Sequence, residues 1–379
     1  LVKSAGGSHQ ETRDLAHALG LPNDSDAFVT FRDYTHHLEY IRSAKDIHER
    51  GMYFNLNAYG HQVLMDFSVV YGRDYAELNS HLNGRGVPNL DIARREIALG
   101  PILQPLGEII NAENLNNLLT ASKDPLRAES FDSLLNHNLD LTARAQEGLR
   151  RTGSVPECGD AKMRSILEKQ LRQILDLENF SKNAGLSLTR MTPRFTKALG
   201  PELLDDPRRK IVLLVWAFFS NLAGSSASAE CRQRSRQVLD EEPAVSLVTK
   251  ALSQLGFDDY EAWKACQAVR WMITNTSWLE EIQTLKTPQL LDKWLQDEQL
   301  REYIEVNEYN KVLWFNQEKF EDMLWYMRVA SILWFASQAD TTTVELLEKN
   351  IQAESHFSRL QDGLKASEYQ LEKLQRALD

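Results

Sequence analysis

The chain has 379 residues, of which 42% are apolar and 26% are charged, and its formal net charge is −11. This length exceeds the usual single core, so we expect two domains or one extended helical array. The acidic balance repels a phosphate backbone, which argues against nucleic acid as a partner. The longest apolar run, Ile211 to Phe219, has nine residues. A helix that crosses a membrane needs about twenty, so we expect no membrane partner.

The three cysteines, Cys158, Cys231 and Cys266, are too few and too far apart for a disulfide framework. We therefore expect free thiols and a reducing, cytoplasmic environment. The sequence begins at Leu1 without a methionine, and it does not open with the charged and apolar segments of a signal peptide. Such a start is typical of a processing boundary or of a chain with a further portion upstream.

The first part of the chain predicts a small mixed element. Residues 11–19 have helical spacing, and residues 26–34 have the alternation and β-branched content of a strand. Residues 35–51 have a threonine cap and a final glycine around an amphipathic pattern, which predicts a helix. In residues 52–72, two β-rich runs flank the turn sequence NAYG, which predicts a hairpin. We expect residues 1–73 to form an α+β element with this β-hairpin and at least three strands.

Beyond Asp74 the strand signals largely stop, and helical spacing dominates. Leu82 to Asp91 is interrupted by glycine and proline, which predicts a loop. The predicted helices cover residues 92–119, 130–149, 161–183, 209–222, 227–255, 259–276 and 289–303. We therefore predict a mostly α fold, in which residues 74–379 form a multi-helix domain.

The predicted last helix, residues 342–378, is amphipathic and has a short heptad seam. Its members alternate in steps of four and three, and they are Leu360, Leu364, Ser367, Leu371, Leu374 and Leu378. Two interpretations remain open. Either this helix packs antiparallel on the helix before it, or it forms an intermolecular coiled coil through which the chain associates with itself.

The segment from Val306 to Phe335 concentrates aromatic residues. Its later aromatics follow the spacing of one helix face, so we expect them in the core. The earlier residues Tyr309, Trp314 and Asn316 fall in a predicted loop, where amphipathic rings and amides often make contacts. We therefore choose Tyr309, Trp314 and Asn316 as candidate contacts for a carbohydrate or a protein partner.

No catalytic motif is visible. The sequence has neither a GxGxxG nor a GxxxxGK[ST] phosphate loop, and it has no GxSxG elbow and no HExxH. His36, His37 and His48 lack the i, i+4 spacing of a helical metal site, so we predict no metal and no cofactor. Catalytic residues therefore stay unknown.

Four segments together resemble the C-terminal part of long bacterial proteins of the α-amylase superfamily, which have a β-domain and a long helical region after their catalytic barrel. The segments are FVTFRDYTHHLEYIRSAKDIHERGMYFNLNAYGHQVLMDFSVVYG, LNGRGVPNLDIARREIALGPI, SQLGFDDYEAWKACQAVRWMI and YIEVNEYNKVLWFNQEKFEDMLWYM. The resemblance implies a retaining mechanism on α-glucans, with an aspartate nucleophile and a glutamate acid/base on a (β/α)₈ barrel. The nucleophile motif Gly-x-Arg-x-Asp is absent, and the GRD at Gly72 to Asp74 has the wrong spacing.

The resemblance implies an ancillary, non-catalytic region of an α-glucan-active glycoside hydrolase or transferase. Such a region buttresses or extends the glucan site, and its partners are the α-glucan or a catalytic barrel domain. The alternative is a stand-alone helical protein-interaction or scaffold module without enzymatic activity. A third interpretation is an enzyme with its site in the helical core, which needs convergent titratable groups.

Overall fold

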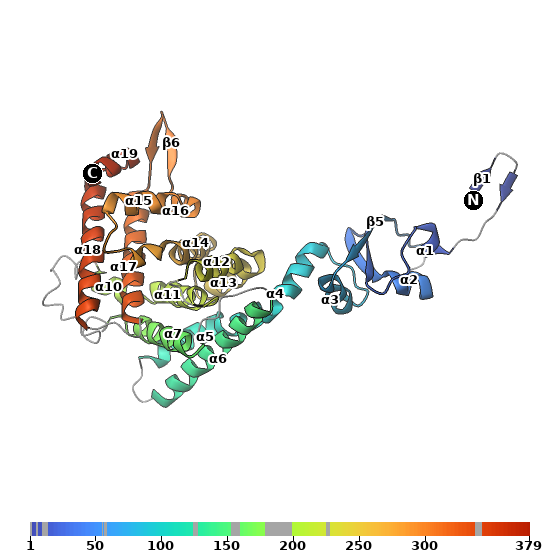
Figure 1. Ribbon diagram of the computed structural model, residues 1–379, viewed down its shortest axis with the longest axis horizontal. Coiled ribbons are helices and arrows are strands. Elements are labelled where there is room, and N and C mark those ends of the chain that lie inside the picture. The colour runs from blue at the N-terminus through green and yellow to red at the C-terminus, as the bar shows by residue number, and fades with distance from the viewer. Residues whose placement is uncertain are drawn as a thin grey trace. The chain divides into compact units, whose positions relative to one another are not determined.

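The computed structural model describes residues 2–4, 7–9, 14–54, 56, 59–123, 128–152, 160–178, 199–224, 228–337 and 343–379. The chain is mostly α, as predicted, with a small antiparallel sheet near the N-terminus. It divides into two compact units, Leu1–Pro101 and Ile102–Asp379. Figure 1 labels the helices and strands of both. The predicted α+β element, residues 1–73, lies within the first unit.

The first unit is built on a three-stranded antiparallel sheet with the strand order β4-β3-β5. Its strands are β3 (Ala27–Asp33), β4 (Leu38–Ser43) and β5 (Leu64–Tyr71). The strand predicted at residues 26–34 is therefore confirmed. Because side chains alternate along a strand, Val29 and Phe31 of β3 enter one apolar cluster and Phe28 enters another. The sheet thus has two buried faces.

Helices cover both faces of this sheet. They are α1 (Leu15–Ala18), α2 (Ala44–Arg50), α3 (Arg73–Leu82) and the start of α4 (Leu90–Ile109). Ala16 of α1 and Ile47 of α2 belong to the cluster of Val29 and Phe31. Leu78 of α3 belongs to the cluster of Phe28. A further short hairpin pairs β1 (Val2–Ser4) with β2 (Gly7–His9).

The helix predicted over residues 35–51 is wrong in its first half, where the chain forms β4. This strand pairs with β3 along its whole length, and Tyr40 stacks on Phe31 with ring centroids 5.5 Å apart. Cross-strand packing therefore outweighs the local helical pattern. The helix begins only at Ala44, after Ser43 accepts a hydrogen bond from the backbone N–H of Asp46.

The hairpin predicted over residues 52–72 is also wrong. Among its described residues, which leave out 55, 57 and 58, only the second half forms a strand, β5, and β5 pairs with β3. In the first half, Tyr53 is 83% exposed and Leu56 is 50% exposed, whereas Met52 and Phe54 pack against the cluster of Val29 and Phe31 without forming a strand. The hairpin of the sheet is formed by β3 and β4. The sheet has the three strands that we expected, but β4 takes the place of the strand predicted before NAYG.

The second unit is helical. Its helices are α5 (Ala112–Ala121), α6 (Ala128–Thr152), α7 (Asp160–Leu175), α10 (Pro201–Leu204), α11 (Pro207–Ser220), α12 (Ala229–Asp240), α13 (Glu242–Gln254), α14 (Asp259–Asn275), α15 (Thr287–Leu295), α16 (Glu298–Tyr303), α17 (Gln317–Ser337), α18 (Thr343–Ala366) and α19 (Leu371–Leu378), with a 3₁₀ turn at Ser277–Glu280. The predicted helices at 92–119, 227–255 and 289–303 are each two helices. Side-chain caps mark two of these breaks, since Asn111 and Asp297 accept backbone N–H groups of α5 and α16. At the third break, α13 has a proline in its first turn.

Two helices, α11 and α17, form the centre of the second unit. The apolar run at residues 211–219 lies in α11 and is buried on all sides. In α17 the later aromatics, among them Phe320, Trp325 and Phe335, are at most 7% exposed, so their predicted place in the core is confirmed. Within the described residues, we find no helix that combines the length and the apolar composition needed to span a membrane.

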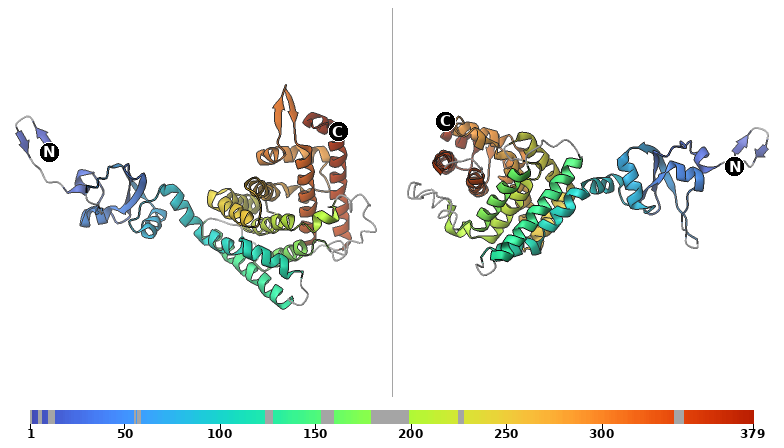
Figure 2. Two further views of the ribbon diagram at one scale, coloured as in Figure 1. Left: turned by 180° about the vertical axis from the view of Figure 1, so that it is seen from behind. Right: turned by 60° about the horizontal axis from the view of Figure 1, so that its bottom comes forward.

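The last helix, predicted as one element over residues 342–378, is wrong as a continuous helix. The chain turns between α18 and α19, where Glu368 and Tyr369 have φ values of 48° and 63°. α19 then packs back on α18. The two helices are so close that a Cβ added at Gly363 would lie only 3.0 Å from Cδ1 of Leu374. α18 itself packs beside the preceding helix, α17 (Figure 1, Figure 2). The six seam residues are at most 5% exposed, so this chain buries them itself and leaves no open seam for a coiled coil.

One hairpin interrupts the helices of the second unit. β6 (Asn307–Tyr309) pairs with β7 (Val312–Trp314). The two residues between them, Asn310 and Lys311, both have positive φ, which is typical of the tight turn that joins antiparallel strands. The predicted loop is thus a hairpin, and sequence reasoning missed these two strands.

An ion pair is buried between α17 and α18. Nε of Arg328 donates to Oε2 of Glu354 at 2.8 Å, and Oγ of Ser358 donates to Oε1 of Glu354 at 2.9 Å. The Arg328 guanidinium also lies 5.1 Å from the ring centroid of Phe357. Arg328 is 1% exposed and Glu354 is 8% exposed, so neither charge can be satisfied by water.

Glu354→Leu should lower the free energy of unfolding by about 3–5 kcal/mol, because the guanidinium of Arg328 then stays buried without a counter-charge. The double variant Arg328→Met with Glu354→Leu should recover most of this loss. Urea unfolding followed by tryptophan fluorescence measures both. Equal losses in the single and double variants would contradict the predicted role of the pair.

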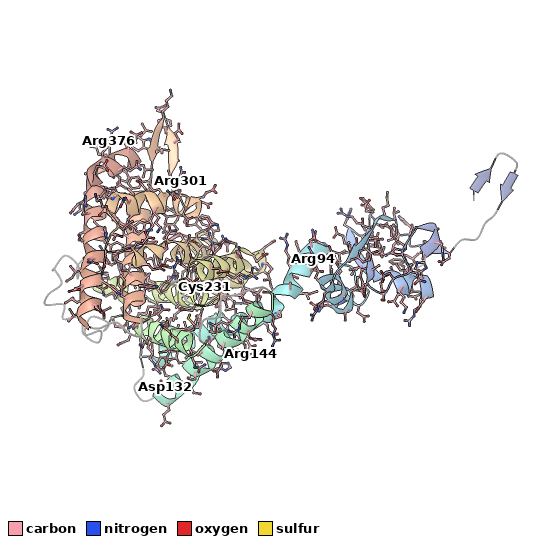
Figure 3. All side chains as sticks on the ribbon, in the orientation of Figure 1. Arg94, Asp132, Arg144, Cys231, Arg301 and Arg376 are labelled. Carbon is pink, nitrogen blue, oxygen red and sulfur yellow. The ribbon has the colours of Figure 1, made fainter. Side chains whose placement is uncertain are left out.

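Cys231 and Cys266 are both buried, and Figure 3 shows Cys231 among packed helices. Cys158 lies outside the described residues. Burial raises the pKa of Cys266 to about 11. At pH 8 its thiolate fraction is then about a hundredfold below that of an ordinary cysteine.

A variant with Cys158→Ser and Cys231→Ser leaves Cys266 as the one thiol. With a disulfide reagent at pH 8, this thiol should react at least about a hundredfold more slowly in the native chain than in urea. The absorbance of the released reagent measures the two rates. Similar rates in both conditions are the outcome that contradicts burial.

Candidate functional site

A polar cleft of about 190 Å³ lies between α11, α14, α16 and α17. We call it the Asp322 cleft, and its charged and phenolic lining residues are Asp206, Arg208, Arg209, Glu261, Lys264, Tyr303, Asp322 and Tyr326. A larger cavity of about 490 Å³ in the first unit is lined mainly by apolar residues and glycines and brings fewer charges together. Convergent titratable groups are the better indication of a site, so we choose the Asp322 cleft.

The carboxylate of Asp322 is the centre of this cleft. Its Oδ1 accepts a hydrogen bond from Nη2 of Arg209 at 2.5 Å, and its Oδ2 accepts one from the hydroxyl of Tyr303. Nζ of Lys264 lies 3.4 Å from Oδ2. Asp322 is 17% exposed, so these contacts are only partly screened by water. Two cations and one phenol thus share one carboxylate.

Aromatic rings hold the cations in place. The Arg209 guanidinium lies 4.5 Å from the ring centroid of Trp325 and 5.3 Å from that of Tyr326, and Nζ of Lys264 lies 5.0 Å from that of Tyr303. Such cation–π contacts stabilise a charge that has left bulk water. In the described part of the chain, the buried Nη1 of Arg209 has no hydrogen-bond partner. This N–H is enclosed by the protein, so the guanidinium is held through its other contacts, above all the one to Asp322.

The pKa values of the cleft define its chemistry. Burial raises the pKa of Tyr303 well above its usual value, and the charge of Asp322 raises it further. Burial also raises the pKa of Tyr326. Burial lowers the pKa of Arg209, but Asp322, Tyr326 and Tyr303 together outweigh this effect, so the net pKa is raised. At neutral pH the phenols are therefore neutral donors, and the cleft is suited to binding through hydrogen bonds.

A second polar group, which we call the Tyr260 face, comprises Tyr260, Trp263, Glu305, Asn316 and Lys319. The rings of Tyr260 and Trp263 are stacked with centroids 6.0 Å apart, and Tyr260 is 52% exposed. Nζ of Lys319 donates to the Tyr260 hydroxyl and to Oε1 of Glu305. Nδ2 of Asn316 donates to Oε2 of Glu305 at 2.9 Å. The hydrogen bond from Lys319 is the main reason that the pKa of Glu305 is lowered.

The two groups are electrostatically linked, since Lys264 of the Asp322 cleft also contributes to the lowered pKa of Glu305. Trp263 and Lys264 are consecutive residues of α14, and Tyr303 and Glu305 are two positions apart at the end of α16. The Asp322 cleft and the Tyr260 face therefore share the same elements. Together they offer aromatic surface, hydrogen-bond donors and carboxylates that are ion-paired with arginine or lysine.

The structure brings only one of the three predicted contact residues into this site. Asn316 caps α17 by accepting the backbone N–H of Lys319 at 3.1 Å, and it belongs to the Tyr260 face. Trp314 lies at the base of the β6–β7 hairpin, where it pairs with Asn307 and is half-buried. Tyr309 is 68% exposed beside the hairpin turn.

Sequence reasoning missed Tyr260, Trp263, Glu305 and Lys319. The signal that could have found the aromatic pair is its i, i+3 spacing at the start of α14, which places two rings on one helix face. No comparable signal existed for Glu305 and Lys319, because their contact with Tyr260 depends on the fold.

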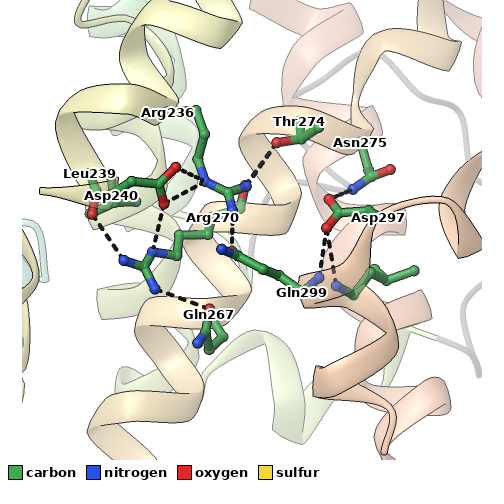
Figure 4. Close-up of polar contacts among 10 residues, drawn as sticks. Arg236, Leu239, Asp240, Gln267, Arg270, Thr274, Asn275, Asp297 and Gln299 are labelled. Atoms are coloured by element: carbon green, nitrogen blue, oxygen red, sulfur yellow. Dashed lines mark hydrogen bonds and ion pairs between the residues drawn. The ribbon is translucent and has the colours of Figure 1, made fainter. Parts of the chain in front are cut away.

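A third polar network, drawn in Figure 4, joins α12 to α14 and α16. Nε of Arg236 binds both oxygens of Asp240 at 3.0 and 3.1 Å, and its Nη1 donates to Oγ1 of Thr274 at 2.9 Å. Nε of Arg270 lies 3.2 Å from Oδ1 of Asp240, and Nη2 of Arg236 donates to Gln299. These contacts tie three helices to one another, so we interpret this network as structural.

Asp322→Ala should lower the free energy of unfolding by about 3 kcal/mol, because Arg209 and Tyr303 then lose their shared, partly buried acceptor. Glu302→Ala, an exposed position in α16, is the matched control and should change it by no more than about 0.5 kcal/mol. Chemical denaturation measures both. An Asp322 variant as stable as the control would show that the carboxylate is not the centre of the cleft.

Comparisons with known proteins add no relative from which a function could be transferred. No model of a known family matches the chain, and neither a curated protein nor a solved structure matches it.

Proposed function

We propose that this chain is an ancillary, non-catalytic region of an α-glucan-active glycoside hydrolase or transferase, and that it contacts the glucan at the Tyr260 face. One observation carries the proposal: an exposed aromatic ring, stacked on a second ring, stands beside a lysine, a carboxylate and an amide. Sugar rings have apolar C–H surfaces that stack on aromatic faces, and their hydroxyls need donors and acceptors at the ring edge.

The sequence resemblance supports the same place. The segment that resembles the α-amylase superfamily at residues 253–273 contains both rings of the Tyr260 face, and the segment at residues 303–327 contains its three polar members. A catalytic barrel is the further partner that this resemblance implies, and its role fits a cytoplasmic protein of carbohydrate metabolism. In this proposal the Asp322 cleft fixes the elements that present the Tyr260 face.

Tyr260→Ala should weaken glucan binding roughly fivefold, because the loss of one stacking ring removes about 1 kcal/mol. Affinity electrophoresis in native gels with and without amylopectin measures the change. Tyr53→Ala is the matched control, since Tyr53 is an exposed tyrosine of the first unit, and it should leave the retardation unchanged. Equal retardation of the Tyr260 variant and the control would exclude the Tyr260 face as the contact.

A second candidate is a helical protein-interaction or scaffold module without enzymatic activity. The observation that favours it is the β6–β7 hairpin, which presents Tyr309 with 68% of its surface exposed. Tyrosine on a short strand is a common anchor for a protein partner. A wild-type chain that shows no retardation in the amylopectin gel would make this candidate the preferred one.

A further inference from the structure

Three side chains with metal-binding atoms converge in the first unit, and none of them belongs to the candidate site. They are Asp14, the N-cap residue of α1, His17 within α1, and His48 within α2. One nitrogen or carboxylate oxygen from each lies within 4.8 Å of the others. Among the described residues, no other group of three or more histidine, cysteine, aspartate and glutamate side chains meets this condition.

The packing of two helices fixes this arrangement. Ala16 and Ile47 are at most 1% exposed in the same apolar cluster, which holds α1 against α2. His17 follows the first of these residues and His48 follows the second, so the buried contact places both imidazoles side by side. Their ring centroids lie 5.3 Å apart in an edge-to-face arrangement. The two histidines are thus positioned by the core.

The hydrogen bonds of His48 leave one of its nitrogens ready to bind a metal. Its Nε2 lies 3.0 Å from the backbone oxygen of Leu21. Because a carbonyl only accepts, Nε2 must carry the proton, and Nδ1 then has a free lone pair. Histidines that bind metals usually donate their other N–H to such a carbonyl or carboxylate, which fixes the ring. Within the described part of the chain, Nδ1 of His48 has no hydrogen-bond partner.

Asp14 supplies the negative charge. Its Oδ2 lies 2.9 Å from Nδ1 of His17. Capping of α1 explains why an aspartate stands at this position. Capping does not explain why His48 approaches from another helix. Nor does it explain why the contact of His48 Nε2 with Leu21 fixes the ring and leaves Nδ1 free.

We propose that Asp14, His17 and His48 bind a divalent transition-metal ion, of which Zn²⁺ is the best match. Two imidazoles and one carboxylate suit zinc and its neighbours, whereas Ca²⁺ and Mg²⁺ need mostly oxygen ligands. Three protein ligands leave a fourth position for water. His17 is 76% exposed, so an ion can enter from solvent. The bound ion ties α1 to α2 and stabilises the first unit.

Isothermal titration of the metal-stripped chain with ZnCl₂ tests the proposal. The wild-type chain should bind one Zn²⁺ saturably and should show no such binding of Mg²⁺. His17→Ala, His48→Ala and Asp14→Ser should each weaken Zn²⁺ affinity by at least about tenfold, which is the smallest loss usually seen even for supporting residues of metal sites. Serine at position 14 keeps a capping side chain for α1 and removes the carboxylate.

His61→Ala is the matched control, because His61 is an exposed histidine of the same unit outside this group. It should bind Zn²⁺ as the wild-type chain does. Far-UV circular dichroism of each variant shows whether the fold is kept, and the absorption spectrum of the Co²⁺ form reports directly on nitrogen and oxygen ligation. A wild-type chain without saturable binding, or folded ligand variants with wild-type affinity, would overturn the proposal.

Discussion

The second unit depends on the burial of two helices, α11 and α17, that are apolar around most of their circumference. Residues 210–220 of α11 are all buried. A helix of this kind is stable only when other helices enclose it, and α7, α14 and α18 provide the cover. Polar side chains inside this core must then find partners, as Lys210 does with Glu178 and Arg328 does with Glu354.

The Asp322 cleft lies where these two helices begin. Arg209 is in the first turn of α11 and Asp322 is in the second turn of α17. At this end of the two helices, charged side chains replace the apolar ones of the core. Packed helices therefore hold the charged groups, and their positions are set before any ligand arrives. The Tyr260 face adjoins this region because its lysine and amide also stand at the start of α17.

Periodicity predicted the helical class and the core position of the α17 aromatics, because these follow from burial of one or more helix faces. It failed where long-range pairing decided the structure, as in β4, whose partner strand overrides a helical pattern. It also failed at the last helix. The leucine spacing runs through the turn at Glu368 and Tyr369 because α18 and α19 both present leucines to the same interior.

The candidate site was predicted only in part for a related reason. Asn316 was identified because it stands in a recognisable loop before a helix, whereas the contact between Tyr260 and Lys319 joins residues 59 positions apart. The proposed metal ligands show the same limitation. His17 and His48 lie on different helices, so the spacing rule for two ligands on one helix could not identify them.

The distribution of tryptophan has a practical consequence for experiments on this chain. All eight tryptophans belong to the second unit, and they are Trp216, Trp263, Trp271, Trp278, Trp294, Trp314, Trp325 and Trp334. Trp216, Trp271, Trp278 and Trp294 are at most 1% exposed. Intrinsic indole emission therefore reports on the helical unit. It does not report on the sheet with helices α1 and α2, which contain no tryptophan. Melting of the first unit needs a backbone probe, and comparing that probe with indole emission separates the two unfolding events.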